Sequence, residues 1–168
     1  MIFNTAHSPS MQLVFSNDIA EVWKNEVTGQ SALYARKDFQ AGDKFNEVGA
    51  SAILKSPSYL TVQKDTDEHI CLHPQFLQYI NHSCSPNVFF DISNGYVLCL
   101  QDIKTGTELT YFYPSTEWEM ASPFQCNCGN SNCLQVIRGA AFLPVETLKN
   151  YRLSEYIQGQ LRSSELVR

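Results

Sequence analysis

Three closely spaced cysteines carry the strongest chemical signal in the sequence. Cys126, Cys128 and Cys133 form a C-x-C-x4-C run, and such a run is typical of a zinc site because structural zinc prefers four thiolate or imidazole ligands in a tetrahedron. The run supplies three thiolates, so a fourth ligand has to come from another part of the chain. Cys84 is the candidate because it lies in a second polar loop, and His82 in the same loop is its competitor.

That second loop, residues 81–87, reads Asn-His-Ser-Cys-Ser-Pro-Asn and lies between two apolar segments. Asn, Ser and Pro favour turns, so an ordinary solvated loop explains the composition. Polar groups this dense must satisfy one another if they are buried, and a loop held beside a ligand explains the composition equally well. Composition alone leaves both interpretations open.

A third stretch, residues 106–113, reads as a strand that ends in aromatic residues. Such residues pack in a core more often than they take part in catalysis. Here the strand pattern breaks at Pro114, directly after Tyr113. The phenol of Tyr113 is therefore able to face a pocket instead of the core.

Short strands rich in Val, Ile, Phe and Tyr must position these three motifs. Turn-forming residues separate most of the strands, and Ser-Asn-Gly at 93–95 is a hairpin signal. A short helix is expected after Pro74, and residues 144–161 are expected to form the only long helix. The expected strands are 13–15, 20–24, 33–35, 44–48, 61–63, 69–72, 88–92, 96–100 and 109–112. The sequence thus predicts a mainly β domain with a helical tail.

Length and charge narrow the class of protein. With 168 residues the chain has room for about one domain. Its 17 acidic and 12 basic side chains give a formal charge of −5, which disfavours non-specific binding to nucleic acids and suits a basic peptide partner. No signal-peptide pattern and no apolar run of membrane-spanning length is visible. We expect a soluble, cytoplasmic or nuclear protein without membrane attachment or direct nucleic-acid binding.

The three motifs together, in this order and spacing, resemble the SET-domain protein lysine methyltransferases that carry a post-SET zinc motif. The resemblance rests on Asn-His-Ser-Cys-x-Pro-Asn at 81–87, Gly-x-Glu-Leu-Thr-Tyr-x-Tyr at 106–113 and the cysteine run at 126–133. It extends over about residues 18–143. It implies an N-terminal extension at 1–17, a SET domain at 18–114, a post-SET zinc segment at 115–143 and a helical tail at 144–168.

The resemblance implies a β-clip-like fold of small antiparallel sheets with a knot-like active-site core and a C-terminal helix. Two opposed clefts would meet at this core, one for S-adenosylmethionine and one for a lysine of a protein or peptide substrate. By position, Asn81 and His82 correspond to cofactor-binding residues. Tyr113 corresponds to the active-site tyrosine at the methyl-transfer channel, where it also borders the cofactor. Tyr111 matches a position where Phe or Tyr affects how many methyl groups are added. The implied zinc ligands are Cys84, Cys126, Cys128 and Cys133.

Three positions depart from the family pattern. The cofactor-binding turn is usually Gly-x-Gly, but residues 29–32 read Gly-Gln-Ser-Ala, so the second glycine is missing. We expect Ser31 and Ala32 to make backbone contacts to the cofactor if the turn does not require a positive φ. Phe112 stands where Asp is common between the two tyrosines, and Gln78 stands where a basic residue often precedes the Asn-His pair.

The resemblance therefore implies an enzyme that methylates the ε-amine of a protein lysine, in a histone-like or other basic segment. Two alternatives belong to other functional classes. One is a SET scaffold that binds a partner without turnover, which the altered glycine turn allows. The other is an S-adenosylmethionine-dependent enzyme that acts on a small molecule.

Overall fold

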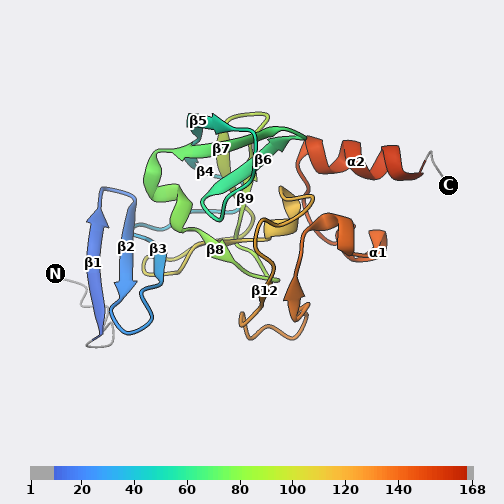
Figure 1. Ribbon diagram of the computed structural model, residues 1–168. Coiled ribbons are helices and arrows are strands. Elements are labelled where there is room, and N and C mark those ends of the chain that lie inside the picture. The colour runs from blue at the N-terminus through green and yellow to red at the C-terminus, as the bar shows by residue number, and fades with distance from the viewer. Residues whose placement is uncertain (1–9, 166–168) are drawn as a thin grey trace.

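The N-terminal part of the chain forms a three-stranded antiparallel sheet. The computed structural model describes residues 10–165, so most of the expected 1–17 extension lies outside the described residues. Its described part belongs to β1 (Met11–Ser16), which pairs with β2 (Ala20–Asn25), and β2 pairs with β3 (Ser31–Ala35). Figure 1 shows this sheet in blue at one side of the molecule.

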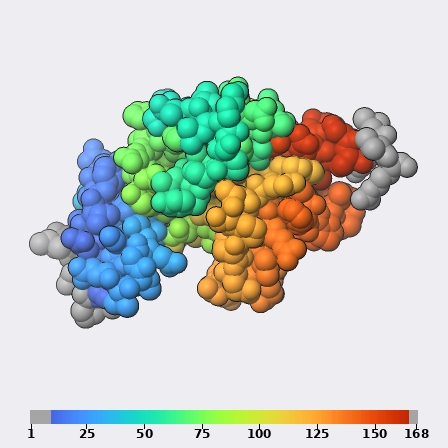
Figure 2. All heavy atoms as spheres, viewed as in Figure 1, coloured from blue at the N-terminus to red at the C-terminus, as the bar shows by residue number. Residues whose placement is uncertain are grey.

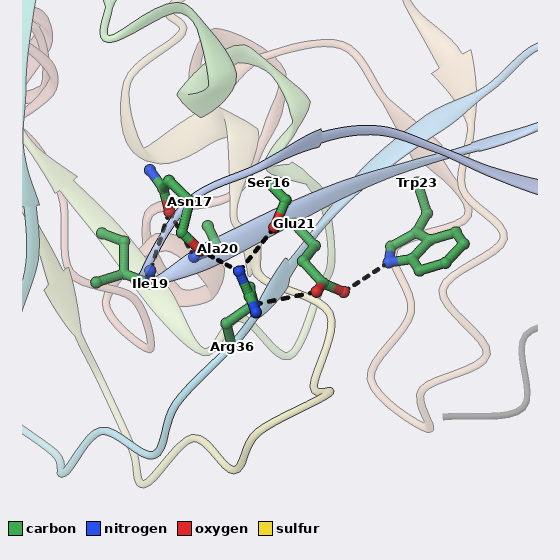
Figure 3. Close-up of polar contacts among 7 residues, drawn as sticks. All are labelled: Ser16, Asn17, Ile19, Ala20, Glu21, Trp23 and Arg36. Atoms are coloured by element: carbon green, nitrogen blue, oxygen red, sulfur yellow. Dashed lines mark hydrogen bonds and ion pairs between the residues drawn. The ribbon is translucent and has the colours of Figure 1, made fainter. Parts of the chain in front are cut away.

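Side-chain hydrogen bonds fix the corner where β1 turns into β2 (Figure 3). The Asn17 Oδ1 atom accepts from the backbone N–H groups of Ile19 and Ala20 at 2.9 and 2.8 Å. The Arg36 guanidinium lies 3.1 Å from the Glu21 carboxylate and donates to the backbone oxygen of Asn17 at 2.8 Å. These bonds satisfy polar groups at the turn and join the residue that follows β3 to the β1–β2 corner.

Two further small sheets complete the main body. One has the order β4-β10-β9, and the other has the order β5-β7-β6. All their pairings are antiparallel. Their strands are β4 (Lys44–Glu47), β9 (Val88–Asp91), β10 (Tyr96–Cys99), β5 (Gly49–Leu54), β6 (Thr61–Asp65) and β7 (Glu68–His73). The prediction of a mainly β fold made of small antiparallel sheets is confirmed.

A short parallel pair lies at the centre of the fold and brings two of the sequence motifs together. β8 (Asn81–His82) pairs with β11 (Thr110–Tyr111). Beyond the pair, the Asn87 side chain accepts from Thr110 N at 2.8 Å and donates to Glu108 O at 2.8 Å. The 81–87 loop is therefore held against the 106–113 strand, with Ser83, Cys84 and Asn87 buried and Ser85 exposed.

One apolar cluster joins the three main sheets. Successive inward positions of β2 and β3, Ala20, Val22, Leu33 and Ala35, are buried in it, as expected for the period-2 alternation of a strand. Each large aliphatic or aromatic side chain buried this way contributes about 1.5–3 kcal/mol. Other members with almost no exposed surface are Leu77, Ile80, Val88, Phe90, Val97, Ile103 and Leu109.

In the described residues, three short 3₁₀ helices connect the strands and motifs. The helix expected after Pro74 is confirmed as η1 (Gln75–Tyr79), which buries Phe76 and Leu77. The others are η2 (Tyr113–Ser115), directly after β11, and η3 (Ala140–Phe142). Strands β12 (Phe124–Gln125) and β13 (Val136–Ile137) form an antiparallel pair around the cysteine run.

The prediction of one long helix over 144–161 is wrong. The segment contains α1 (Val145–Leu148) and α2 (Glu155–Glu165), separated by an irregular stretch. α1 ends at Leu148, and in the irregular stretch Tyr151 stacks on Phe112, with ring centroids 3.7 Å apart. Ser154 then starts α2, because its Oγ accepts from the backbone N–H of Ile157 at 3.3 Å. None of the described helices is long and apolar enough to span a membrane.

Gly139 is fixed by a close approach between two backbones. Its φ is +117°, and an added Cβ would overlap Trp118 O and lie 2.9 Å from Glu119 Cα. We expect Gly139→Ala to lower the free energy of unfolding by about 2–4 kcal/mol, since it combines backbone strain with overpacking. Gly42→Ala is the matched control, because Gly42 also has a positive φ, +91°, but a Cβ there would meet no described atom within 4 Å. Equal melting temperatures for the two variants would contradict this explanation.

Candidate active site and metal centre

A cavity of about 1170 Å³ lies between the N-terminal sheet and the segment that carries the cysteines. Figure 2 shows the surface hollowed between the blue β2–β3 region and the orange segment that contains the cysteine run. The wall combines four parts of the chain that are far apart in the sequence. These include Lys24 and Gly29–Ser31, Tyr59–Val62, Gln78–Ser83, and Tyr111, Tyr113, Glu117 and Met120–Cys128 with interruptions.

Asn81 joins the expected cofactor side of the cavity to the N-terminal sheet. Its Nδ2 donates to Ser31 O at 3.0 Å and to Glu108 Oε1 at 3.2 Å. Both Asn81 and Ser31 line the cavity. Ala32 pairs with Trp23 across β2 and β3, and in the described structure it lies beside the lining residues, not among them.

The missing second glycine leaves no strain in this turn. Gly29 has a positive φ of +74°, whereas Gln135 is the one non-glycine residue with a positive φ in the described part of the chain. Ser31 and Ala32 therefore have ordinary backbone conformations that any residue adopts. The backbone of Ser31 is free to border the cavity without a glycine at that position.

His82 links the same wall to the tyrosine segment. Its Nδ1 accepts from Tyr113 N at 3.2 Å, and its Nε2 lies 3.4 Å from Cys84 Sγ. Burial lowers the pKa of the imidazole to about 4, so the ring is neutral near pH 7. Since Nδ1 accepts, Nε2 carries the proton, and His82 has no free lone pair for a metal. This arrangement favours Cys84 over His82 as the fourth ligand.

Tyr111 and Tyr113 form a second wall of the cavity. Their ring centroids are 4.6 Å apart, and Tyr111 packs edge-on against Phe90 at 4.7 Å. Burial raises the pKa of Tyr113 to about 12, helped by the charges of Glu117 and Glu108, and burial also raises the pKa of Tyr111 well above its usual value. Both phenols are neutral hydrogen-bonding groups at any physiological pH.

The four predicted cysteines lie together next to this site. The sulfur atoms of Cys84, Cys126, Cys128 and Cys133 all lie within 4.8 Å of one another, and those of Cys84 and Cys126 are 3.9 Å apart. Four thiolates around zinc at about 2.3 Å place sulfur atoms roughly 3.8 Å apart, so the donor set and spacing fit that ion. Burial raises the pKa of Cys84 to about 12, because an isolated thiolate there lacks a counter-charge that a divalent cation would supply.

Comparison with known proteins agrees with this geometry. The profile of the SET domain family matches residues 24–114, which contain both the 81–87 loop and the tyrosine strand. The chain belongs to the SET domain family. The matched region ends before the cysteine run, so the assignment of 115–143 to a post-SET zinc segment stays a prediction that rests on the four clustered thiols.

Individual relatives of this SET domain are methyltransferases by name. The chain is 37% identical over 128 residues to "Methyltransferase flvH" of Aspergillus flavus, an alignment that covers 75% of this chain and 71% of that protein. It is 26% identical over 116 residues to "Histone-lysine N-methyltransferase set9" of Schizosaccharomyces pombe, covering 62% of this chain and 26% of that protein. With "Histone-lysine N-methyltransferase ASHH2" of Arabidopsis thaliana it shares 37% identity over 68 residues, 37% of this chain and 4% of that protein.

The structure explains one departure from the SET pattern, Phe112, and places another, Gln78, in the cavity wall. Phe112, at the common Asp position, is buried in a second apolar cluster with Leu148 and Ile157. An aspartate there would be buried against these side chains and the Tyr151 ring, which is unfavourable for a charged group. The phenylalanine instead packs against the apolar C-terminal segment. Gln78, at the position that is often basic, lines the cavity.

Sequence reasoning missed Glu117, a buried ionisable residue that lines the cavity of this SET domain. It lies four residues beyond Tyr113, lines the cavity and is 5% exposed. Burial raises the pKa of its carboxyl to about 7. In the sequence it stands in Ser-Thr-Glu after a proline, which reads as an ordinary polar turn. No local signal distinguishes it from an exposed glutamate.

Proposed function

We propose that this SET domain transfers a methyl group from S-adenosylmethionine to the ε-amine of a lysine on a protein. The observation that carries the proposal is the tyrosine pair, Tyr111 and Tyr113, in the wall of the same cavity as Asn81, His82 and Ser31. Methyl transfer to an amine requires a site for the cofactor and groups that orient the amine. The 81–87 loop is expected to provide the first, and the neutral phenols the second.

The residues around the cavity fit the cofactor. Asn81, His82 and the backbone of Ser31 would hold it, and it supplies an electrophilic methyl group when bound. The sulfonium is a cation, so a neutral His82 at this wall avoids a charge repulsion that a protonated imidazole would create. The side chain of Tyr113 packs against the His82 ring with centroids 5.2 Å apart, which keeps the phenol next to the cofactor-binding loop.

On the amine side, this chain must orient a neutral nitrogen. A free lysine with a pKa of about 10.4 costs roughly 4 kcal/mol to deprotonate near pH 7.4, and a poorly hydrated channel reduces this cost by disfavouring the ammonium. The hydroxyls of Tyr113 and Tyr111 would hold the nitrogen so that its lone pair points along the reaction axis. Oxygen atoms there also offer weak C–H···O contacts to a methyl group.

The substrate class follows from charge and from the named relatives. The net charge of −5 suits a lysine in a basic segment such as a histone tail. Relatives named as histone-lysine methyltransferases support a protein lysine. The name of flvH states only a methyltransferase, so an enzyme acting on a small-molecule amine remains the competing function.

We infer that the metal of the cysteine cluster is one structural zinc ion. Cys84 comes from the cofactor-binding loop, whereas Cys126 and Cys128 border the cavity from the other side. An ion held by all four thiolates would tie the two walls together. Binding of cofactor is then expected to depend on the metal.

Tyr111→Phe is expected to raise the number of methyl groups added. We expect the wild type to stop at one or two methyl groups, since the Tyr111 hydroxyl holds the amine, or a water beside it, where a further methyl would lie. Displacing such a group costs about 1–2 kcal/mol, which slows each later transfer roughly tenfold. Mass spectrometry of a methylated peptide measures the product ratio. Mostly trimethylated product from the wild type, or no shift in the variant, would contradict this role.

Two measurements on the purified protein test the proposed function. Calorimetric titration with S-adenosylmethionine is expected to give one site per chain, whereas a binding module without turnover would give none. A peptide array covering the core histone tails, with each lysine peptide paired to its arginine variant, is expected to take label from methyl-labelled cofactor only on lysine peptides. A protein that binds the cofactor but labels arginine controls and lysine peptides equally would contradict protein lysine as the substrate.

A further inference from the structure

The Glu117 carboxyl is buried, and among the described residues it forms no ion pair with a positively charged group. Its Oε1 accepts hydrogen bonds from Gln63 N at 2.8 Å and from Thr116 Oγ1 at 3.2 Å. Its other oxygen, Oε2, has no hydrogen-bond partner within the described residues, and Glu117 belongs to none of the ion pairs found there. Because Glu117 lines the cavity, this oxygen is left available to a group inside it.

Other elements hold the carboxyl rigidly in this place. Gln63 of β6 donates its backbone N–H to Glu117 and accepts from Trp118 N through its side-chain oxygen at 2.9 Å. The same side chain donates to the hydroxyl of Tyr156 in α2 at 3.1 Å. A carboxylate that is buried without a cation is costly, and a scaffold that fixes one so firmly points to a use for the charge.

The carboxyl is connected to the proposed amine-binding group. Thr116 is fully buried, and its hydroxyl lies 3.2 Å from Glu117 Oε1 and 3.4 Å from the backbone oxygen of Tyr113. Glu117 is therefore connected through Thr116 to the residue that carries the Tyr113 phenol. The charge of Glu117 also acts directly on both tyrosines, since it raises the pKa of each.

Neither the two phenols nor His82 is suited to accept a proton near pH 7. The pKa of Tyr113 is raised to about 12 and that of Tyr111 is raised well above its usual value, because burial disfavours both phenolates. His82 uses its one acceptor nitrogen for Tyr113 N. The pKa of Glu117, raised to about 7 by burial, is close to the value at which a general base works best at neutral pH.

We propose that Glu117 is the catalytic base that removes a proton from the substrate ammonium before methyl transfer. This inference rests on the proposed function. One N–H bond of the ammonium breaks, its electron pair stays on nitrogen, and the proton forms an O–H bond with Oε2 of the carboxylate. The nitrogen lone pair then forms the new N–C bond, while the electron pair of the breaking S–C bond stays on sulfur. The carboxylic acid afterwards returns its proton to water at the cavity mouth.

Glu117→Gln tests this step because it keeps the shape and the acceptor oxygen but cannot take a proton. At pH 7 we expect kcat on a labelled histone-tail peptide to fall about 100-fold, with cofactor affinity and melting temperature near those of the wild type. The titratable groups that face Glu117 are Tyr111 and Tyr113, with Tyr156 reached through Gln63. All are phenols, so wild-type kcat should level off above about pH 7, whereas the variant should gain about tenfold per pH unit.

Glu119→Gln is the matched control, because Glu119 is exposed and undergoes the same chemical change two residues away. It is expected to keep wild-type kcat and the wild-type pH profile. A Glu117→Gln variant within threefold of the wild type at pH 7, or one reduced by the same factor at every pH, would overturn the inference. Wild-type activity in the same assay tests the proposed function separately: an active wild type with an equally active Glu117→Gln variant would sink only the base.

A measurement on the wild type covers the case in which Glu117→Gln does not fold. Carbon-13 NMR of protein labelled at the glutamate carboxyl carbon, without substrate, is expected to show one signal that titrates near pH 7. Glu117→Asp identifies that signal by its absence. If all glutamate signals titrate below pH 5, the proposal is wrong.

Discussion

Removal of zinc with a chelator is expected to abolish both cofactor binding and methyl transfer. Structural zinc sites contribute apparent binding energies of about 10 kcal/mol or more, which is as large as the whole stability of a typical domain. Without the ion, Cys126 and Cys128 lose their link to Cys84, and the segment that closes one side of the cavity loses its anchor. Metal analysis should find one zinc per chain before chelation, and activity should return when zinc is added back.

Cysteine variants test the ligand set itself. Cys84→Ala combined with Cys126→Ala is expected to lose the metal and to melt at a much lower temperature. Cys71→Ser is the matched control, since Cys71 lies in β7 outside the group of four thiols and should retain a full equivalent of zinc. Less than about half an equivalent in the wild type, or full zinc retention in the double variant, would contradict a four-thiolate site.

Tyr113→Phe is expected to lower turnover about 100-fold while leaving the fold and cofactor affinity unchanged. The substitution removes one hydroxyl and keeps the ring, which packs against His82 and against Phe124 at 5.9 Å. The loss should therefore fall on kcat, because the hydroxyl orients the amine in the reacting complex. Steady-state kinetics with calorimetry of cofactor binding separates the two effects.

Tyr96→Phe serves as the control for this change. Tyr96 lies in β10, where its ring packs under the Lys44 ammonium at 4.3 Å, and it belongs to another sheet from the cavity wall. This variant should retain wild-type kinetics. Wild-type turnover in Tyr113→Phe would show that Tyr113 only packs, and a loss of cofactor affinity equal to the loss of turnover would assign it to binding.

The sequence predicted the strands and the cysteine cluster well, for physical reasons. Period-2 alternation and turn residues depend on neighbours along the chain, so most strands of the three main sheets were found within one or two residues. The cysteine run is likewise a local pattern. Cys84 was only a candidate for the fourth ligand, because the preference for it over His82 depends on the hydrogen bond from Tyr113 N, a contact between distant segments.

Features that depend on tertiary contacts were missed. β5 has no buried side chain, so its sequence carries no alternating pattern, and it forms because β7 offers an edge. The break between α1 and α2 arises from the stacking of Tyr151 on Phe112, which no helical periodicity encodes. Glu117 is buried because Gln63 and Thr116 enclose it, and only the fold brings Gln63 there.

The central claim is transfer of a methyl group to a protein lysine, and one measurement tests it most directly. The protein is incubated with methyl-deuterated S-adenosylmethionine and a cell lysate, and the protein and small-molecule fractions are analysed separately by tandem mass spectrometry, with Tyr113→Phe as a parallel control. We predict deuterated methyl groups on lysine ε-nitrogens of a small set of proteins, strongly reduced with the variant. Label confined to the small-molecule fraction, or found on protein equally with both enzymes, would contradict the claim.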